Sequence, residues 1–140
     1  MGTETDYNKA PSIKTEEAIK ESHKVLIVED NETILDYVKK VLATCSESIH
    51  VVEARNGIEG YKQFKAEEPD LIFMDIVMPE SDGYQATAMI RQEDQTVPII
   101  ALTAKALQGE KEECINSGMD DYLSKPVSLK QLKEMLKKYL

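Results

Sequence analysis

The sequence predicts an α/β fold in which a parallel sheet is covered by helices on both faces. Short, continuous apolar runs alternate with longer segments whose apolar residues recur every three to four positions. Such runs suit strands that are buried on both faces, as in parallel sheets. Because this alternation repeats along the chain, we expect five strands and five helices arranged as a three-layer sandwich.

Five apolar segments mark the expected strands. Those at 25–28 (VLIV) and 71–74 (LIFM) are continuous runs that end at acidic residues, and the segment at 97–102 (VPIIAL) is similar. The segments at 51–54 and 122–123 are weaker, because one contains a glutamate and the other is very short. All of them are short enough to favour strands over buried helices.

Helical spacing connects these runs. The last expected helix has the clearest pattern, because lysines separate its apolar residues. Gly118 follows the fourth helix and fits a left-handed C-cap. The residues expected to face inward are, helix by helix, Ile34, Val38, Val41 and Leu42; Ile58, Tyr61 and Phe64; Tyr84, Ala88 and Ile90; Cys114 and Ile115; and Leu129, Leu132, Met135 and Leu136.

Length and composition predict one acidic domain. The chain has 140 residues, and residues 1–23 are polar and mixed in charge, so we expect a flexible N-terminal tail or linker before a domain at 24–140. With 26 acidic and 17 basic residues and a net charge of −9, the chain does not resemble a nucleic-acid binder. No apolar run approaches the length of a membrane span, so we expect a cytoplasmic protein without membrane insertion.

Polar residues follow four of the five expected strands. Glu29 and Asp30 follow the first, Asp75 the third, Thr103 the fourth and Lys125 the fifth. Ligands of open parallel sheets bind beyond the carboxyl ends of the strands, so these groups converge if their strands are adjacent. Three clustered carboxylates repel one another and persist together when they hold a hard cation. One lysine leaves two negative charges uncompensated, which a magnesium ion would neutralise.

Each of these residues also has an ordinary structural interpretation. Asp30 or Asn31 can cap the first helix, and Thr103 can cap the fourth. Asp75 can form a turn, and Lys125 can be a solvated surface lysine. Their joint placement at the ends of four strands favours a site over these separate explanations.

The predicted cluster is suited to phosphoryl transfer. A carboxylate beside a magnesium ion can attack phosphorus, and aspartyl phosphate is an established covalent intermediate. Asp75, on the expected central strand, is the candidate nucleophile, and Lys125 and the Thr103 hydroxyl would meet the phosphoryl oxygens. The candidate ligands for Mg²⁺, or for Mn²⁺ in its place, are Glu29, Asp30, Asp75 and the backbone carbonyl of Val77.

Four segments resemble the receiver domain of two-component response regulators: VLIVEDN, DLIFMDIVMPESDG, PIIALTA and GMDDYLSKP. The resemblance covers residues 24–140, and it is specific because all the site positions occur in order. It implies a flavodoxin-like fold whose five-stranded parallel sheet has the order 2-1-3-4-5. It also implies that Asp75 accepts phosphate from a phosphohistidine, with Glu29 and Asp30 as the acidic pair.

The resemblance further implies a conformational switch. Thr103 and Tyr122 match the switch pair of the family, in which the hydroxyl turns toward the phosphoryl group and the aromatic ring turns inward. Lys125 and Pro126 match a pair whose peptide bond is typically cis in this family. Phosphorylation is expected to change the face formed by the fourth helix, the fifth strand and the fifth helix. The candidate partner residues there are Ala106, Leu107, Tyr122, Lys130 and Lys133.

The partner implied by the resemblance is a histidine kinase or a histidine phosphotransfer protein. The domain itself is not expected to be an enzyme, although it assists its own phosphorylation and dephosphorylation. The segment at 101–127 (ALTAKALQGEKEECINSGMDDYLSKPV) looks more like receivers attached to hybrid histidine kinases, but a stand-alone single-domain regulator stays open. We expect a monomer or a weak dimer that makes no direct contact with nucleic acid.

Three rival functions fit less well. A phosphatase of the haloacid-dehalogenase type would place a second aspartate two residues after the nucleophile, where this chain has Val77. A flavin- or nucleotide-binding domain would need a phosphate loop rich in Gly, Ser or Thr after the first strand, where this chain has EDNETIL. A non-catalytic interaction module, with the carboxylates acting as helix caps, predicts no dependence on magnesium.

Overall fold

The computed structural model describes residues 22–76, 83–104 and 108–140, which contain five strands and five helices. The strands are β2 (His23–Val28), β3 (Ile49–Ala54), β4 (Leu71–Asp75), β5 (Ile99–Thr103) and β6 (Asp121–Ser124). The helices are α2 (Glu32–Cys45), α3 (Gly57–Glu67), α4 (Gly83–Arg91), α5 (Gln108–Asn116) and α6 (Leu129–Tyr139). The predicted alternation of strands and helices is confirmed.

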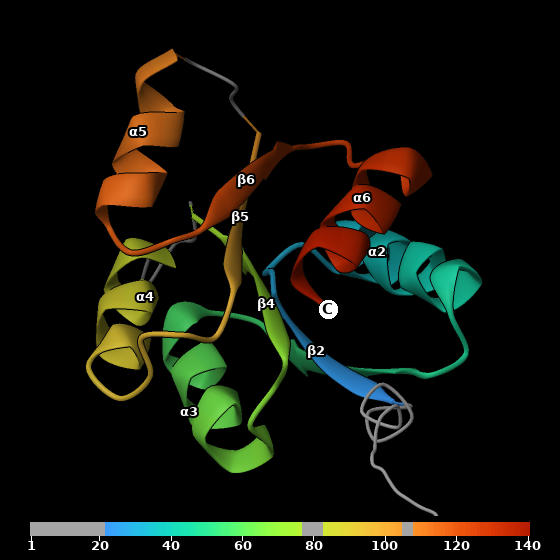
Figure 1. Ribbon diagram of the computed structural model, residues 1–140, viewed down its shortest axis with the longest axis horizontal. Helices are drawn as coiled ribbons and strands as arrows, with labels where there is room; N and C mark the ends of the chain where they lie inside the picture. Colours follow the sequence, from blue (N-terminus) through green and yellow to red (C-terminus); the bar gives the residue numbers. More distant parts are fainter. Residues whose placement is uncertain (1–21, 77–82, 105–107) are drawn as a thin grey trace, which may run out of the picture.

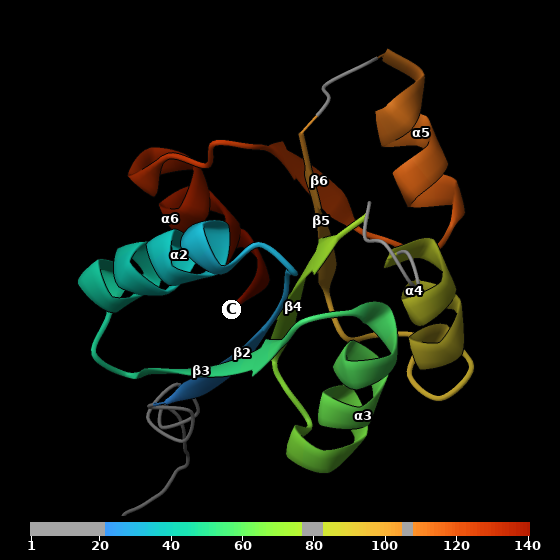
Figure 2. The same ribbon diagram turned by 180° about the vertical axis from the view of Figure 1, so that it is seen from behind.

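All five strands form one parallel sheet in the order β3-β2-β4-β5-β6. Counted along the chain, this is the order 2-1-3-4-5, which confirms the fold that the resemblance implied. The helices α2 and α6 cover one face of the sheet, and α3, α4 and α5 cover the other (Figures 1 and 2). The sheet is therefore the middle of three layers, and its central strand β4 is buried throughout.

Successive residues of β2 point into opposite layers. Val25 and Ile27 pack with α2 and α6, whereas Leu26 and Val28 pack with the helices on the other face. All four side chains are fully buried, which explains why this strand is a continuous apolar run rather than an alternating one. The core therefore lies on both sides of the sheet.

Of the three residues of α3 that were expected to face inward, Phe64 and Tyr61 pack against the core and Ile58 does not. Ile58, which was expected to point inward, is 53% exposed, and the buried residues of the helix are Gly57, Gly60 and Phe64. A Cβ atom at Gly60 would lie only 2.8 Å from Cγ2 of Val28. Glycine lets this helix approach β2 closely, and a count of apolar residues alone overlooks that contact.

Three other residues that were expected to face inward are exposed: Ala88 in α4, Ile115 in α5 and Leu129 in α6. Adjacent residues of a helix are rotated by about 100°, so the neighbour of a buried residue turns toward solvent. Ile115 follows the fully buried Cys114, and Ala88 follows the fully buried Thr87. In helices this short, a shift of one residue in the predicted pattern exchanges the two faces.

The strand β2 begins one residue before position 24, where the domain was expected to begin. His23 belongs to β2, where it is paired with Ile49, and its backbone N–H donates to the carbonyl of Ser48 at 2.9 Å. The tail predicted over residues 1–23 falls outside the described residues as far as position 21. None of the described helices is both long and apolar enough to cross a membrane.

Candidate functional site

The predicted site residues come from the carboxyl ends of four neighbouring strands. Glu29 and Asp30 follow β2, Asp75 is the last residue of β4, and Thr103 is the last residue of β5. Lys125 follows β6, and its backbone N–H donates to the carbonyl of Thr103 at 2.7 Å. Because β2, β4, β5 and β6 are neighbours in this order, their ends lie along one edge of the sheet.

Three carboxylates meet at this edge. Glu29, Asp30 and Asp75 each have a carboxylate oxygen within 4.8 Å of the other two. Glu29 and Asp75 are buried, with 1% and 3% of their surface exposed, whereas Asp30 is open to solvent. Ionised carboxylates this close repel one another, and burial makes the repulsion stronger. The cluster therefore needs positive charge.

Lys125 supplies part of that charge. Its Nζ atom lies 2.7 Å from Oε1 of Glu29 and 3.4 Å from Oδ2 of Asp75. Its side chain is only 13% exposed, so it is held in the site and is not a solvated surface lysine. The peptide bond between Lys125 and Pro126 is cis.

The remaining charge and the kind of donor fit a hard divalent cation. Three carboxylates and one ammonium group leave two negative charges in the cluster. The donors that come together are carboxylate oxygens, which Mg²⁺ and Mn²⁺ prefer over nitrogen- or sulfur-rich sites. Asp30 is exposed, so an ion at this place would keep access to water and to an incoming substrate. The residues present therefore fit a magnesium site.

Helix capping at the start of α2 leaves Asp30 available to the cluster. The cap is Asn31, whose side-chain oxygen accepts from the backbone N–H of Ile34 at 3.0 Å. The backbone N–H of Asn31 donates to Oε2 of Glu29 at 3.2 Å, which orients that carboxylate. Of the two caps that the sequence allowed, the structure uses the asparagine, so the aspartate beside it has no capping role.

Gly83 supports the backbone at Asp75, a contribution that sequence reasoning missed. It is buried at the start of α4, and a Cβ atom there would lie 2.4 Å from the carbonyl oxygen of Asp75. The same atom would lie 2.8 Å from Cγ of Met74 and 3.0 Å from Cα of Ile76. Only glycine allows α4 to begin against the strand that carries Asp75. The Ser-Asp-Gly sequence just after the third run was the available signal.

The hydroxyl of Thr103 is hydrogen-bonded to the first turn of α5. Its Oγ1 donates to Oε1 of Glu110, in the first turn of that helix, at 2.6 Å. Thr103 is 1% exposed. Tyr122, its expected partner in switching, is partly buried against the core below α4 and α5, and Nζ of Lys111 lies 5.7 Å from its ring centre. The role of Glu110 was not anticipated.

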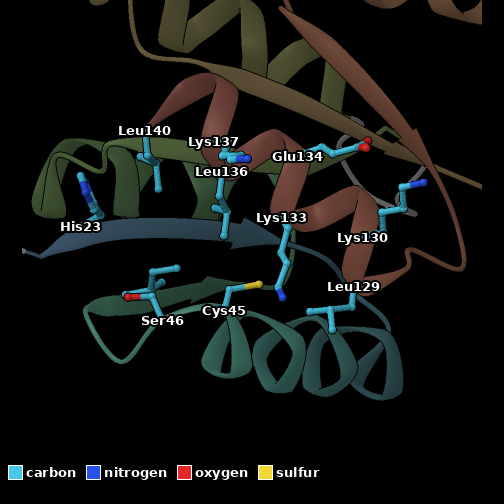
Figure 3. Close-up of a pocket in the computed structure, with 11 residues that line it drawn as sticks. His23, Cys45, Ser46, Leu129, Lys130, Lys133, Glu134, Leu136, Lys137 and Leu140 are labelled. Carbon is cyan, nitrogen blue, oxygen red and sulfur yellow. The ribbon is translucent and has the colours of Figure 1, made fainter.

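The expected partner face is only partly described. Ala106, Leu107 and the carbonyl of Val77 lie outside the described residues. Lys130 and Lys133 line a hollow of about 650 Å³ between α2 and α6 (Figure 3). Apolar groups, among them Cys45, Ile49 and Leu136, line the same hollow. Tyr122 packs into the core on the opposite side of the sheet, so the structure does not bring it together with the two lysines.

A second hollow lies directly beside the acidic cluster. It has a volume of about 570 Å³ and is mainly apolar, and Lys125 forms part of its wall. The hydroxyl of Tyr37 on α2 donates to the carbonyl of Val127 at 2.7 Å and so connects two of its walls. The other lining residues are Thr33, Ile34, Val38, Ala104 and Pro126. Sequence reasoning missed this surface because it joins α2 to the loop after β6.

Three comparisons with known proteins bear on this geometry. A family model described as the response regulator receiver domain matches residues 25–137. Hybrid signal transduction histidine kinase G of Dictyostelium discoideum is 45% identical over 119 residues, which are 83% of this chain and 4% of that protein. The response regulator DivK of Brucella anthropi, which acts in polar differentiation, is 35% identical over 118 residues, covering 83% of this chain and 94% of DivK.

A solved structure is similar in both fold and sequence. The receiver domain of sensor histidine kinase PA1611 from Pseudomonas aeruginosa was crystallised with a magnesium ion coordinated in its active-site cleft. It matches with a TM-score of 0.76 and 37% sequence identity, covering 84% of this chain and 97% of that domain. Hence the chain spans a small part of the hybrid kinase that it matches and nearly the whole length of DivK and of this domain.

Proposed function

Because this chain belongs to the response regulator receiver domain family of two-component signalling, we propose that Asp75 accepts a phosphoryl group from a phosphohistidine. The observation that carries the proposal is the meeting of Glu29, Asp30 and Asp75 with Lys125 at the carboxyl edge of the sheet. No ordinary capping role explains this cluster, and phosphoryl transfer needs the charge neutralisation and positioning that it offers.

In the proposed reaction, a carboxylate oxygen of Asp75 attacks phosphorus and forms an O–P bond. The P–N bond of the phosphohistidine breaks, and its electron pair stays on the imidazole nitrogen, which takes up a proton from water. Lys125 is held by its ion pair with Glu29. Its ammonium group has three N–H donors, so it can also donate to the phosphoryl oxygens. This ammonium therefore stabilises the charge that the transfer brings to Asp75.

Glu29, Asp30 and Asp75 are the side chains that would hold a magnesium ion, and the carbonyl of Val77 is the expected fourth protein ligand. When bound, the ion would offset the charge of both the attacking carboxylate and the phosphoryl oxygens. The magnesium reported in the related receiver of PA1611 supports this assignment. Mn²⁺, another hard divalent ion, would serve in its place.

The donor is proposed to be a histidine kinase or a histidine phosphotransfer protein. The apolar hollow between α2 and the loop after β6 lies beside Lys125, so a donor seated there would bring its histidine close to Asp75. Its apolar lining favours contact with an apolar helix surface of the partner. The same chemistry applies whether the chain works inside a hybrid histidine kinase or as a stand-alone regulator.

The proposal is tested by incubating the protein with acetyl phosphate and recording its intact mass with and without Mg²⁺. We expect one phosphoryl adduct that requires Mg²⁺ and is absent from Asp75→Asn. If acetyl phosphate fails, a phosphorylated histidine phosphotransfer protein is the second donor. No adduct with either donor, or an adduct that survives in Asp75→Asn, would overturn the assignment.

A further inference from the structure

We propose that Glu110 is a positioning residue for the phosphoryl switch: it holds the Thr103 hydroxyl in the resting state and releases it on phosphorylation. This inference rests on the proposed function, because it requires a phosphoryl group on Asp75. Its basis is the hydrogen bond from Oγ1 of Thr103 to Oε1 of Glu110. This bond joins the end of β5 to the first turn of α5.

The bond has the geometry of a strong interaction. The oxygen–oxygen distance is 2.6 Å, within the range of hydroxyl groups that donate to ionised carboxylates. Thr103 is 1% exposed, and the bond is partly buried, so water competes weakly for the hydroxyl. The carboxylate of Glu110 therefore fixes the rotamer of Thr103 in the unphosphorylated protein.

Phosphorylation would create a second acceptor for the same proton. Asp75 and Leu102 are register partners on adjacent strands, and Thr103 is the next residue of β5. A threonine hydroxyl has one proton, so it donates either to Glu110 or to a phosphoryl oxygen on Asp75. The phosphoryl group is also anionic, and it would repel the carboxylate of Glu110 as Thr103 turns away.

The first turn of α5 contacts both residues of the expected switch pair. Glu110 accepts from Thr103, and the next residue, Lys111, lies over the ring of Tyr122. Farther along the described part of α5, Cys114 is buried with its Sγ 3.7 Å from the Tyr84 hydroxyl, and Ile115 is exposed. Loss of the bond to Glu110 would thus free the start of α5 and move the cation that covers Tyr122.

A purely structural role for Glu110 is the competing explanation. An acidic residue in the first turn of a helix stabilises it through the helix dipole, whatever its hydrogen-bond partner. Such a role predicts that Glu110→Ala loosens α5 without changing the orientation of Thr103. It also predicts that Glu110→Gln and Glu110→Ala behave alike, since both remove the charge.

The experiment compares Glu110→Ala, Glu110→Gln and the control Glu112→Gln, which removes a charge from an exposed position of the same helix. Methyl NMR of Thr103 is recorded without phosphate and, for the wild type, after phosphorylation. Phosphorylation rates with acetyl phosphate and Mg²⁺ are measured in parallel. We expect the Thr103 methyl signal of Glu110→Ala to move toward the phosphorylated position, with a smaller movement in Glu110→Gln, whose side chain still accepts a hydrogen bond.

The phosphorylation rate should rise in the same order, by about tenfold in Glu110→Ala, the factor typical for one hydrogen bond to a charged group. Glu112→Gln should match the wild type in both measurements. An unmoved Thr103 signal in Glu110→Ala, or equal effects of Ala and Gln, would overturn the role of Glu110. A wild type that takes up no phosphate would instead overturn the proposed function, and the methyl shift without phosphate would still show whether Glu110 holds Thr103.

Discussion

The helices α5 and α6 lie on opposite faces of the sheet, and the contacts that hold them to it differ (Figure 1). Each follows a strand that ends at the acidic site. The helix α6 begins with a capping box between Ser128 and Gln131 and buries Leu132 completely. Met135, Leu136 and Tyr139 of α6 also pack against this core, whereas in the described part of α5 Cys114 is buried and Ile115 is exposed. Firm attachment suits a helix that supports the site, and weak attachment suits one that moves.

Asp121 strengthens the attachment of α6. Burial acts to raise the pKa of this carboxyl group, but hydrogen bonds from the Tyr122 N–H, Lys138 and Tyr139 outweigh it and hold the pKa below its usual 3.8. Nζ of Lys138 lies 3.1 Å from Asp121, and the Tyr139 hydroxyl donates to it at 3.0 Å. The last turn of α6 is therefore tied to β6, whereas the side chain of Glu110 in the first turn of α5 is hydrogen-bonded to Thr103 at the end of β5.

The largest expected effect tests the packing difference between the two helices. Leu132→Ala should lower the free energy of unfolding by about 2–5 kcal/mol, because it leaves a cavity in the core. Ile115→Ala should change it by less than about 0.5 kcal/mol, because that side chain is exposed. Chemical denaturation measures both. Equal losses in the two variants would break the comparison.

The next effect comes from the negative charge of the acidic cluster at the carboxyl edge of the sheet. Asp75→Asn should raise the free energy of unfolding of the metal-free protein by about 1 kcal/mol, since it removes one of three repelling carboxylates. Added Mg²⁺ should stabilise the wild type, by linkage, more than it stabilises the variant. Thermal melts in chelator and in millimolar Mg²⁺ measure this. If the variant were less stable than the wild type in chelator, the carboxylates would not be under electrostatic strain.

An effect of similar size that depends on pH tests the tie at the end of α6. Asp121→Asn should cost about 1 kcal/mol near neutral pH, mostly from the hydrogen bonds of Tyr122 and Tyr139, because Lys138 is largely exposed. The folded pKa lies below the unfolded one, so this stability is present above pH 4 and is lost as the pH falls through the folded pKa. The unfolding curves of the variant and the wild type should therefore differ at neutral pH and converge at acidic pH.

Asp36→Asn is the matched control for this series, because Asp36 is exposed on α2. We expect it to follow the wild type at every pH. A difference between Asp121→Asn and the wild type that grew on acidification would have the wrong sign for a carboxylate whose pKa is lowered by folding.

The sheet and the strand-end residues were predictable because both follow from local pattern. Continuous apolar runs identify strands buried on both faces, and the residues just after such strands in a parallel sheet must share one edge. Contacts between distant segments were not predictable in this way. Gly83 against Asp75 and Glu110 against Thr103 depend on how α4 and α5 pack, which no single run reveals. Ile58 of α3 was wrongly expected to face inward, because Gly57 and Gly60, which lie on the buried face, carry no apolar signal.

The central claim is that phosphorylation loosens α5 while α6 stays in place. Amide hydrogen exchange of the full chain, before and after phosphorylation in Mg²⁺, tests it directly because it reports local opening of each helix. We predict faster exchange of the amides in the first turns of α5, and unchanged exchange in α6 around the buried Leu132. Unchanged exchange in α5, or a larger change in α6 than in α5, would contradict the account.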